Sequence, residues 1–509
     1  MGFLPFFSLE TWILLITFCC IFVMYGHWTY GVFEKLGIPG PKPKMYFGTV
    51  GRMNPVFYIE DSLLAQKYGK VWGMYELRKP VLAVMDPDVL KIVLIKECLT
   101  HFTNRRNLRL NGDLSDAVSI AEDDQWRKIR SVLSPYFSSG RMKEMFNIMK
   151  HHSHKLTVKL QSSLANNDVI NVKEFFGPYS MDIMISIGFG GDMDFINNPS
   201  CPLLTLVSAI INIYLFSVSG CFPVVLPLLE LLGVSFFSRT TTGHFKKIVE
   251  KFRAERKGSS HQVWNITIII FLMLNRDSSI TVNGPRGEKQ NQGLSDSEIV
   301  SQLTMFAMAG YETSAITLTF LAYNLARNPE ITKRLQEEID TTFPSKGPVQ
   351  YEALMQMEYL DAVIKESLRL SPPIPRLERQ AKETVKINDL TIPKDMIVMI
   401  PVYALHRDPE LWPEPEEFKP ERFSKENKDS INPYTYLPFG MGPRNCLGMR
   451  FALLLVKLAL VEVLQKFSFS VCKETMIPLK MDASGILGPL HPIKLKLEPR
   501  STDSEHVDK

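Results

Sequence analysis

The chain has 509 residues, of which 45% are hydrophobic and 22% are charged, and its formal net charge is +4. This composition is typical of a globular protein with a large core, and the near-neutral charge gives no indication of a nucleic-acid or strongly acidic partner. The seven cysteines include no C-x-x-C pair and are irregularly spaced, which argues against a disulfide framework, a zinc ribbon or a dithiol site.

The first predicted element is an apolar segment, Phe3–Tyr25, whose only charged residue is Glu10. It is long enough to span a bilayer as a helix. No basic segment precedes it and no A-x-A-like site follows, which favours a retained anchor over a cleaved signal peptide. Lysines and arginines follow the segment and indicate a cytoplasmic body. We expect a transmembrane anchor over residues 1–26, a Pro-rich linker over 27–50, serving as a rigid spacer or an ordinary connection, and one domain over 51–509.

The next segments mix short strands with helices. Val71–Asp86 has short apolar runs around turn residues and predicts strands, whereas Asp123–Ile170 is mostly helical in pattern. Cys201–Phe237 is strongly apolar but interrupted by glycine and prolines. It predicts short helices that roof a pocket and touch the bilayer surface, or a buried helix pair. The histidine cluster at 151–154 is expected on a surface helix and not at a metal site.

A long helix is predicted near the middle of the chain. Ser295 and Glu298 form a capping-box pattern, and Asn328 followed by Pro329 stops the helix. The segment exceeds 30 residues, which corresponds to ~45 Å of helix. Such a helix can cross a whole domain.

The middle of this helix contains the sequence Ala309-Gly310-Tyr311-Glu312-Thr313. Gly310 lowers helix propensity, and the hydroxyl of Thr313 can donate to the carbonyl of Ala309 four residues earlier. An acid and an alcohol therefore lie beside a weakened turn. A packed helix with a chance glycine is the alternative.

Two further motifs contribute charged groups. Glu366 and Arg369 lie at i and i+3 on one predicted helix, and Arg422 lies in the segment Pro420–Phe423. If the fold brings the two segments together, they form an Arg–Glu–Arg cluster, which fixes geometry more than it adds stability.

The most informative segment surrounds Cys446. Glycines and a proline force a tight loop before it, and Leu447–Lys466 predicts an apolar helix, so the thiol lies near a helix N-terminus that favours the thiolate. Arg444 can bind an anionic group, and Gly448 lets a flat ligand approach the backbone. These residues fit a thiolate bound to a metal macrocycle that supplies its own nitrogens. A buried structural cysteine and a nucleophilic cysteine remain open.

These motifs together resemble those of the cytochrome P450 superfamily. The segment Phe439-x-x-Gly442-x-Arg444-x-Cys446-x-Gly448 matches its haem-binding signature, and the other three motifs occur in the family's order. Segments along nearly the whole chain look like family 3, subfamily A of vertebrates. The resemblance implies a mainly α fold with small β-sheets (α+β), in which haem lies between the long central helix and a C-terminal helix bearing the cysteine loop.

The resemblance also implies a role for individual residues. Cys446 is expected to be the axial ligand, and haem b is held by Arg105, Trp126, Arg130, Arg379, Arg444, Phe439 and Gly448. Glu312 and Thr313, with Ala309, are expected to deliver protons. The structural triad is Glu366, Arg369 and Arg422. The expected substrate pocket contains Leu108, Ser119, Ile120, Met305, Met308, Ala309, Ile374, Pro375 and Ile486.

The implied activity is insertion of one oxygen atom of O2 into lipophilic substrates such as steroids and drugs. Electrons are expected from NADPH through cytochrome P450 reductase, docking near Arg127, Lys128 and Lys143, with cytochrome b5 as a second partner, at the endoplasmic reticulum membrane. Alternatives are an endoperoxide isomerase and a haem- or lipid-binding relative without turnover. The chain departs from the subfamily at Leu108 and Met308, where aromatics are usual, and over Val263–Asn275.

Overall fold

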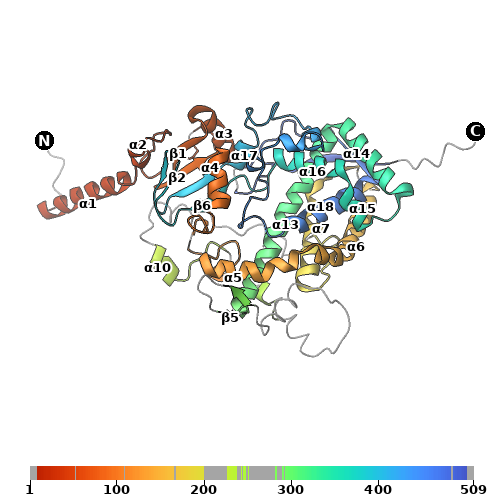
Figure 1. Ribbon diagram of the computed structural model, residues 1–509, viewed down its shortest axis with the longest axis horizontal. Coiled ribbons are helices and arrows are strands. Elements are labelled where there is room, and N and C mark those ends of the chain that lie inside the picture. Colours follow the sequence, from red (N-terminus) through yellow and green to blue (C-terminus); the bar gives the residue numbers. More distant parts are fainter. Residues whose placement is uncertain are drawn as a thin grey trace, which may run out of the picture.

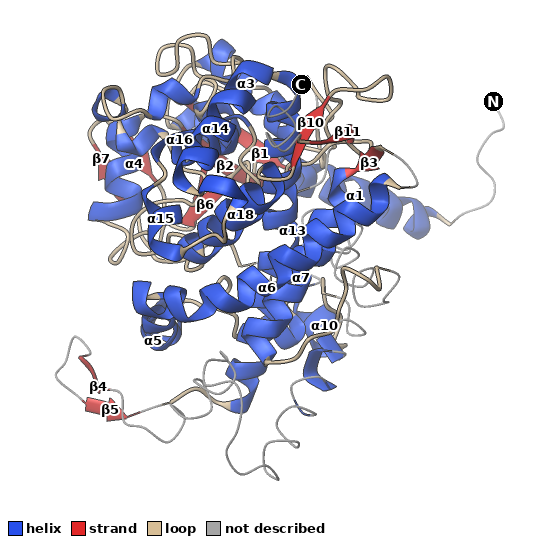
Figure 2. Cartoon of the chain, turned by 90° about the vertical axis from the view of Figure 1, so that its right-hand side faces the viewer, coloured by secondary structure: helices blue, strands red, loops and turns tan. Residues whose placement is uncertain are grey.

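The computed structural model describes residues 8–51, 53–107, 109–165, 168–199, 226–237, 242–243, 245–247, 250, 281–283, 289–291, 293–482 and 485–500. Helices surround several small sheets, and one helix projects from the body (Figures 1 and 2). The α+β expectation is therefore confirmed. Leu108, Val263–Asn275 and residues 201–225 of the apolar segment lie outside the described residues.

The helices appear in the following order. They are α1 (Leu9–His27), α2 (Val32–Lys35), α3 (Phe57–Tyr68), α4 (Pro87–Lys91), α5 (Asp123–Leu133), α6 (Ser139–Leu164), α7 (Val172–Phe189), α10 (Leu226–Leu231), α13 (Asp296–Arg327), α14 (Pro329–Thr342), α15 (Tyr351–Gln356), α16 (Glu358–Leu370), α17 (Val402–Leu405) and α18 (Met449–Leu464). The predicted helical run to residue 170 was wrong at its end, because Val169–Asn171 pairs as a strand with Lys494–Lys496.

The largest sheet contains β1 (Val71–Glu76), β2 (Lys79–Val84), β9 (Ile397–Ile400) and β6 (Leu377–Gln380), in that order. A second sheet has the order β10 (Phe467–Ser470), β11 (Lys494–Pro499) and β3 (Val169–Asn171). Two hairpins are formed by β4 (Thr281–Asn283) with β5 (Lys289–Asn291), and by β7 (Val385–Ile387) with β8 (Leu390–Ile392). The strands predicted within Val71–Asp86 are thus confirmed as an antiparallel pair.

The central helix α13 begins as predicted. The hydroxyl of Ser295 accepts from the amide of Glu298 at 3.2 Å, and the Glu298 carboxylate accepts from the amide of Ser295 at 2.7 Å. The helix has 32 residues, or ~48 Å, and crosses the body in Figure 1. Residues Ser314–Ala326 are buried on every side, which identifies this half as a core helix.

The glycine in this helix is explained by packing against α7. A Cβ atom on Gly310 would overlap the side chain of Met184, and Ser180 donates to the Gly310 carbonyl at 2.9 Å. Gly310 therefore allows α7 and α13 to approach closely, and this contact was not predictable from the motif alone. The hydroxyl of Thr313 donates to the Ala309 carbonyl at 2.6 Å, as predicted.

The histidine cluster on α6 lies on two sides of the helix. His151 is exposed, but His152 is 1% exposed and shares a hydrogen bond with Ser186 at 2.8 Å. The expectation of a surface cluster was therefore wrong for His152. Its place on the inner face of α6 follows from the packing of α6 on α7, which the local sequence does not indicate.

Candidate functional site

The loop that carries Cys446 is fixed by backbone contacts. The amide of Cys446 donates to the carbonyl of Phe439 at 2.8 Å, and Gly440 and Gly442 adopt φ angles of 68° and 76°. A Cβ atom on Gly442 would overlap the carbonyl oxygen of Leu94. The two glycines therefore serve different needs, since both supply positive φ but only Gly442 also allows a close backbone approach.

The Cys446 side chain is exposed on one side, although protein surrounds the rest of it. Desolvation raises the pKa of its thiol, while the amide of Gly448 and the guanidinium groups of Arg105 and Arg130 lower it. The net shift is upward, so the nearby helix does not by itself produce a thiolate. Helix α18 begins at Met449, three residues beyond the thiol, where the dipole is weaker.

Four arginines that are expected to hold haem lie around this thiol. Burial lowers the pKa of Arg105 and Arg130, and both lie close enough to Cys446 to interact with its charge. Burial and the nearby Arg105 lower the pKa of Arg379 to about 10, and burial with Arg105 and Arg379 lowers that of Arg444 to about 9. Within the described chain, none of the four makes an ion pair with a carboxylate.

The N–H groups of these arginines differ in their partners. Arg444 donates to the carbonyls of Thr103, Val118 and Ala121 at 2.8, 3.2 and 2.6 Å, and its guanidinium lies 4.4 Å from the Trp126 ring centre. In contrast, the Nε of Arg379 is buried and has no hydrogen-bond partner, although the residue is 1% exposed.

Arg130 also supports the cysteine loop directly. It donates to the carbonyl and side-chain oxygens of Asn445 at 2.9 and 2.7 Å. Its helix, α5, buries Trp126, Ile129 and Val132. Helix α5 therefore presents both Trp126 and Arg130 to the cysteine loop.

This arrangement fits the expected haem. Buried cations that make no ion pair are unfavourable, and an anion that enters the group relieves this cost. Haem b carries propionate groups that can serve as this anion. Arg379, whose Nε is orphaned, lies close to Arg105, and Arg105 in turn lies close to the Cys446 thiol. The chemistry of these side chains therefore matches that of a haem with its propionates.

The middle of α13 is open where the neighbouring residues of the helix are buried. Ala309 is exposed and Glu312 and Thr313 are half-buried, whereas Ala307 and Ser314 are buried. This turn and the cysteine loop belong to one hydrophobic core, in which Met308 of α13 and Leu447 beside the cysteine are both packed. The open turn of α13 therefore has the exposure expected of a ligand-binding segment.

Sequence reasoning missed the partner of Glu312. The ammonium group of Lys173, on α7, lies 2.5 Å from Glu312 Oε1, and Glu312 Oε2 is buried without a hydrogen-bond partner. Lys173 precedes Glu312 by 139 residues and lies in no recognisable motif. Only the packing of α7 on α13 brings the two together.

The expected pocket residues come from five segments of the chain, and backbone or side-chain hydrogen bonds join several of these segments. Val118 donates to Gln302 of α13 at 2.7 Å, which holds the segment with Ser119 and Ile120 beside that helix. Leu487 donates to the carbonyl of Pro373 at 3.0 Å, which joins the segments of Ile374, Pro375 and Ile486. Met305, Met308 and Ile486 are half-buried, Ile374 is 39% exposed and Pro375 is buried.

The predicted Arg–Glu–Arg cluster forms behind this site. Arg369 donates to both oxygens of Glu366 at 2.8 Å, and Arg422 donates to Glu366 at 3.3 Å. Arg369 also donates to the carbonyls of His406 and Pro415, both at 2.8 Å. Glu366 and Arg369 are fully buried, so the cluster ties α16 to the segment before the cysteine loop.

The three expected docking residues are all ion-paired. Arg127 lies 2.6 Å from Asp124 and Lys128 lies 3.0 Å from Glu298, while Lys143 pairs with Glu352. The side chain of Lys143 is 63% exposed, whereas those of Arg127 and Lys128 are only 36% and 24% exposed. A redox partner that docks here therefore has to compete with the acidic side chains of this chain.

Comparison with known proteins agrees with this geometry. The sequence profile of the cytochrome P450 family matches residues 38–497. Cytochrome P450 3A27 of Oncorhynchus mykiss is 55% identical over 504 residues, covering 98% of this chain and 96% of that protein. Cytochrome P450 3A12 of Canis lupus familiaris is 46% identical over 507 residues, covering 98% and 99%. The chain therefore belongs to the cytochrome P450 family of haem-thiolate monooxygenases.

Proposed function

We propose that Cys446 is the axial thiolate ligand of the haem and that Arg105, Arg130 and Arg379 neutralise its propionates. The observation that carries the assignment is a buried group of arginines that make no ion pair within the described chain and lie near one open thiol. Arg444 adds positive charge, while its N–H groups hold the surrounding loops through backbone carbonyls. Trp126 supports this position by stacking on Arg444.

When bound, the haem supplies the activation of dioxygen, and a thiolate ligand favours cleavage of the O–O bond. The chain supplies the surroundings of that chemistry. Coordination to the haem iron would hold the Cys446 thiol in its deprotonated form, despite the desolvation that otherwise raises its pKa.

We assign proton delivery to the open turn of α13. The Thr313 hydroxyl donates a hydrogen bond to the Ala309 carbonyl, so its lone pairs remain available to accept a hydrogen bond from a proton-carrying group. Glu312 can exchange protons through Oε2, which has no other hydrogen-bond partner. The Lys173 ammonium holds Oε1 in place.

We assign lipophilic small molecules, including steroids and drugs, as substrates. The support is the apolar character of the segments that meet above the turn, with Met305, Met308, Ile374 and Ile486 only partly covered. Such surfaces bind apolar ligands through burial of their area. The segment with Leu108 completes the expected pocket but lies outside the described part of the chain.

We further propose that electrons come from NADPH through cytochrome P450 reductase, with cytochrome b5 as a second donor, at the endoplasmic reticulum membrane. Helix α1 is long and apolar enough to cross a membrane, and it projects from the body in Figure 1. The basic side chains of Arg127, Lys128 and Lys143 support an acidic partner.

The carbon monoxide difference spectrum of the reduced protein tests the ligand assignment. The wild type and a Cys472→Ser control should both show the red-shifted Soret band of thiolate ligation, because Cys472 lies in the segment between β10 and β11. Cys446→Ser should lose that band. A Cys446→Ser protein that keeps the thiolate band would falsify the assignment.

A further inference from the structure

The anchor helix α1 meets the body through a close contact at its C-terminal end. Gly26 is the only buried residue of α1. A Cβ atom at this position would lie 2.7 Å from Met45 Cγ and 2.7 Å from Tyr46 Cε2. Because the backbone of Gly26 is helical, the glycine is needed for this close approach and not for its conformational freedom.

Tyr46 contacts the last turns of α1 through both its ring and its hydroxyl group. Its ring stacks on Phe22 with centroids 4.6 Å apart, and its hydroxyl donates to the Phe22 carbonyl. Tyr46 itself has a φ angle of 66°, which is costly for a bulky residue and persists only where neighbouring contacts impose it.

Those contacts come from the loop around Tyr46 and from the sheet. Lys44 and Gly48 exchange two backbone hydrogen bonds of 2.8 Å, and the amide of Thr49 donates to the carbonyl of Tyr75 in β1 at 2.8 Å. The loop that holds α1 is therefore an extension of the largest sheet.

A second contact reaches α1 from the turn between β1 and β2. The Arg78 guanidinium lies 3.5 Å from the centre of the Tyr25 ring, and Arg78 is only 5% exposed. The negative face of a tyrosine ring attracts a guanidinium group, and more strongly when the pair is desolvated. Helix α1 is thus held from two directions, by Tyr46 and by Arg78.

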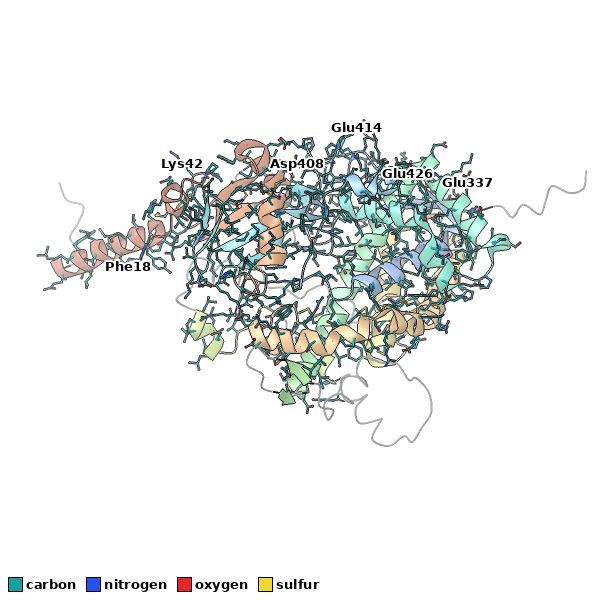
Figure 3. All side chains as sticks on the ribbon, viewed as in Figure 1. Phe18, Lys42, Glu337, Asp408, Glu414 and Glu426 are labelled. Carbon is teal, nitrogen blue, oxygen red and sulfur yellow. The ribbon has the colours of Figure 1, made fainter. Side chains whose placement is uncertain are left out.

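The segment after the helix is also packed on the sheet. Phe33 of α2 is 4% exposed, and the amide of Gly73 in β1 donates to the carbonyl of Pro39 at 2.8 Å. Residues 27–50, expected from sequence to be a linker, therefore lie against the body where they follow α1. In Figure 3, Phe18 lies on α1 away from the body, and Lys42 lies at the body.

We propose that α1 and the catalytic body form one rigid unit, locked by a joint of Tyr25, Gly26, Tyr46 and Arg78, so that the bilayer holds the body at a fixed angle. The proposal rests on the membrane anchoring proposed above. The 19 residues of α1 span ~28 Å, close to the hydrocarbon thickness of a bilayer, so the joint lies at the membrane surface.

Two exposed aromatic residues beside the joint support this depth. Trp28 follows α1 directly and is 82% exposed, and Phe47 follows Tyr46 and is 72% exposed. Tryptophan is enriched at the membrane interface, and an exposed phenylalanine can bury its apolar ring there. The rings of Trp28 and Phe47 therefore lie beside the joint, at the depth where α1 leaves the lipid.

Spin-label distance measurements on the full-length protein in phosphatidylcholine nanodiscs test the joint. One label is placed on native Cys19 and the other on Lys67→Cys, both exposed, in a background in which Cys20, Cys201, Cys221 and Cys472 are replaced by serine. A rigid joint predicts a single narrow distance distribution. Haem content, read from the absorption spectrum, verifies that each variant is folded.

Two variants and one control complete the test. Gly26→Leu inserts a side chain where Met45 and Tyr46 lie, and Tyr46→Ala removes the ring without adding bulk, so both should shift the narrow peak to a broad distribution. Met24→Leu changes an exposed residue of the same helix end and should keep the narrow peak. A broad wild-type distribution, or narrow peaks unchanged in both joint variants, refutes the joint.

Flotation with phosphatidylcholine vesicles separates the two proposals. If the wild type does not float, the membrane anchor is refuted and the joint has no role in orientation. If the wild type floats but its distance distribution is broad, the anchor stands and the joint is refuted.

Discussion

Replacement of Gly442 by alanine should disrupt the cysteine loop far more than the same replacement at Gly440. Both residues have positive φ, which costs an alanine about 1–2 kcal/mol. At Gly440, the new Cβ meets only Leu377 and Asn445 atoms at 3.6–3.9 Å. At Gly442 it overlaps the Leu94 carbonyl, a backbone atom that cannot rotate away.

The clash at Gly442 adds at least about 2 kcal/mol, as in overpacked cores, so the total reaches about 3–5 kcal/mol. Unfolding entropy scales with chain length, and in a chain of this size 1 kcal/mol shifts the melting temperature by about 1 °C. We expect Gly440→Ala to lower the melting temperature by about 1–2 °C and Gly442→Ala by about 3–5 °C.

The carbon monoxide difference spectrum should separate the two variants more clearly than the melting temperature does. Displacing Gly442 moves the loop that holds Cys446, so Gly442→Ala should lose much of the thiolate band in the carbon monoxide difference spectrum, whereas Gly440→Ala should keep it. Equal loss of the band in the two variants would show that positive φ alone, and not the contact with Leu94, limits these positions.

Three further predictions concern charged groups. Lys173→Met should change the free energy of unfolding by less than about 1 kcal/mol, because the Lys173–Glu312 pair is partly exposed. The variant should form less product per NADPH consumed, because it releases Glu312. An unchanged ratio of product to NADPH contradicts a role for the pair. Glu366→Gln leaves Arg369 buried without its counter-charge and should cost about 3–5 kcal/mol, measured as loss of haem-containing protein on expression. Burial lowers the pKa of His406 to about 3, whereas the pKa in the unfolded chain is about 6.5. The neutral, buried imidazole therefore contributes its full stability above pH 6.5, and this contribution is lost as the pH falls toward 3. In His406→Gln, the free energy of unfolding should depend less steeply on pH in that range.

Local sequence signals were sufficient where the interaction lies within a few residues. The capping box of Ser295 and Glu298, the Thr313 bond to Ala309 and the pairing of Glu366 with Arg369 all join residues at i to i+4. Their geometry follows from the helix alone.

The remaining features depend on contacts between distant segments. Arg444 was expected to bind an anion, but its N–H groups reach carbonyls more than 300 residues away in sequence. A glycine is required at position 310 because the side chain of Met184 packs against it, and the partner of Glu312 is Lys173. No local pattern marks any of these partners. The packing of α7 on α13 brings Met184 to Gly310 and Lys173 to Glu312.

The two buried arginine clusters show how a structural ion pair differs from a ligand site. Arg369 is as buried as Arg379, but both oxygens of Glu366 and several carbonyls satisfy it within the chain. Arg379 has no carboxylate partner, its Nε lacks an acceptor, and burial lowers its pKa to about 10. The first cluster is complete without a ligand, whereas the second becomes favourable only when an anion enters. Haem binding should therefore stabilise the fold itself, since it supplies the charge that these arginines lack.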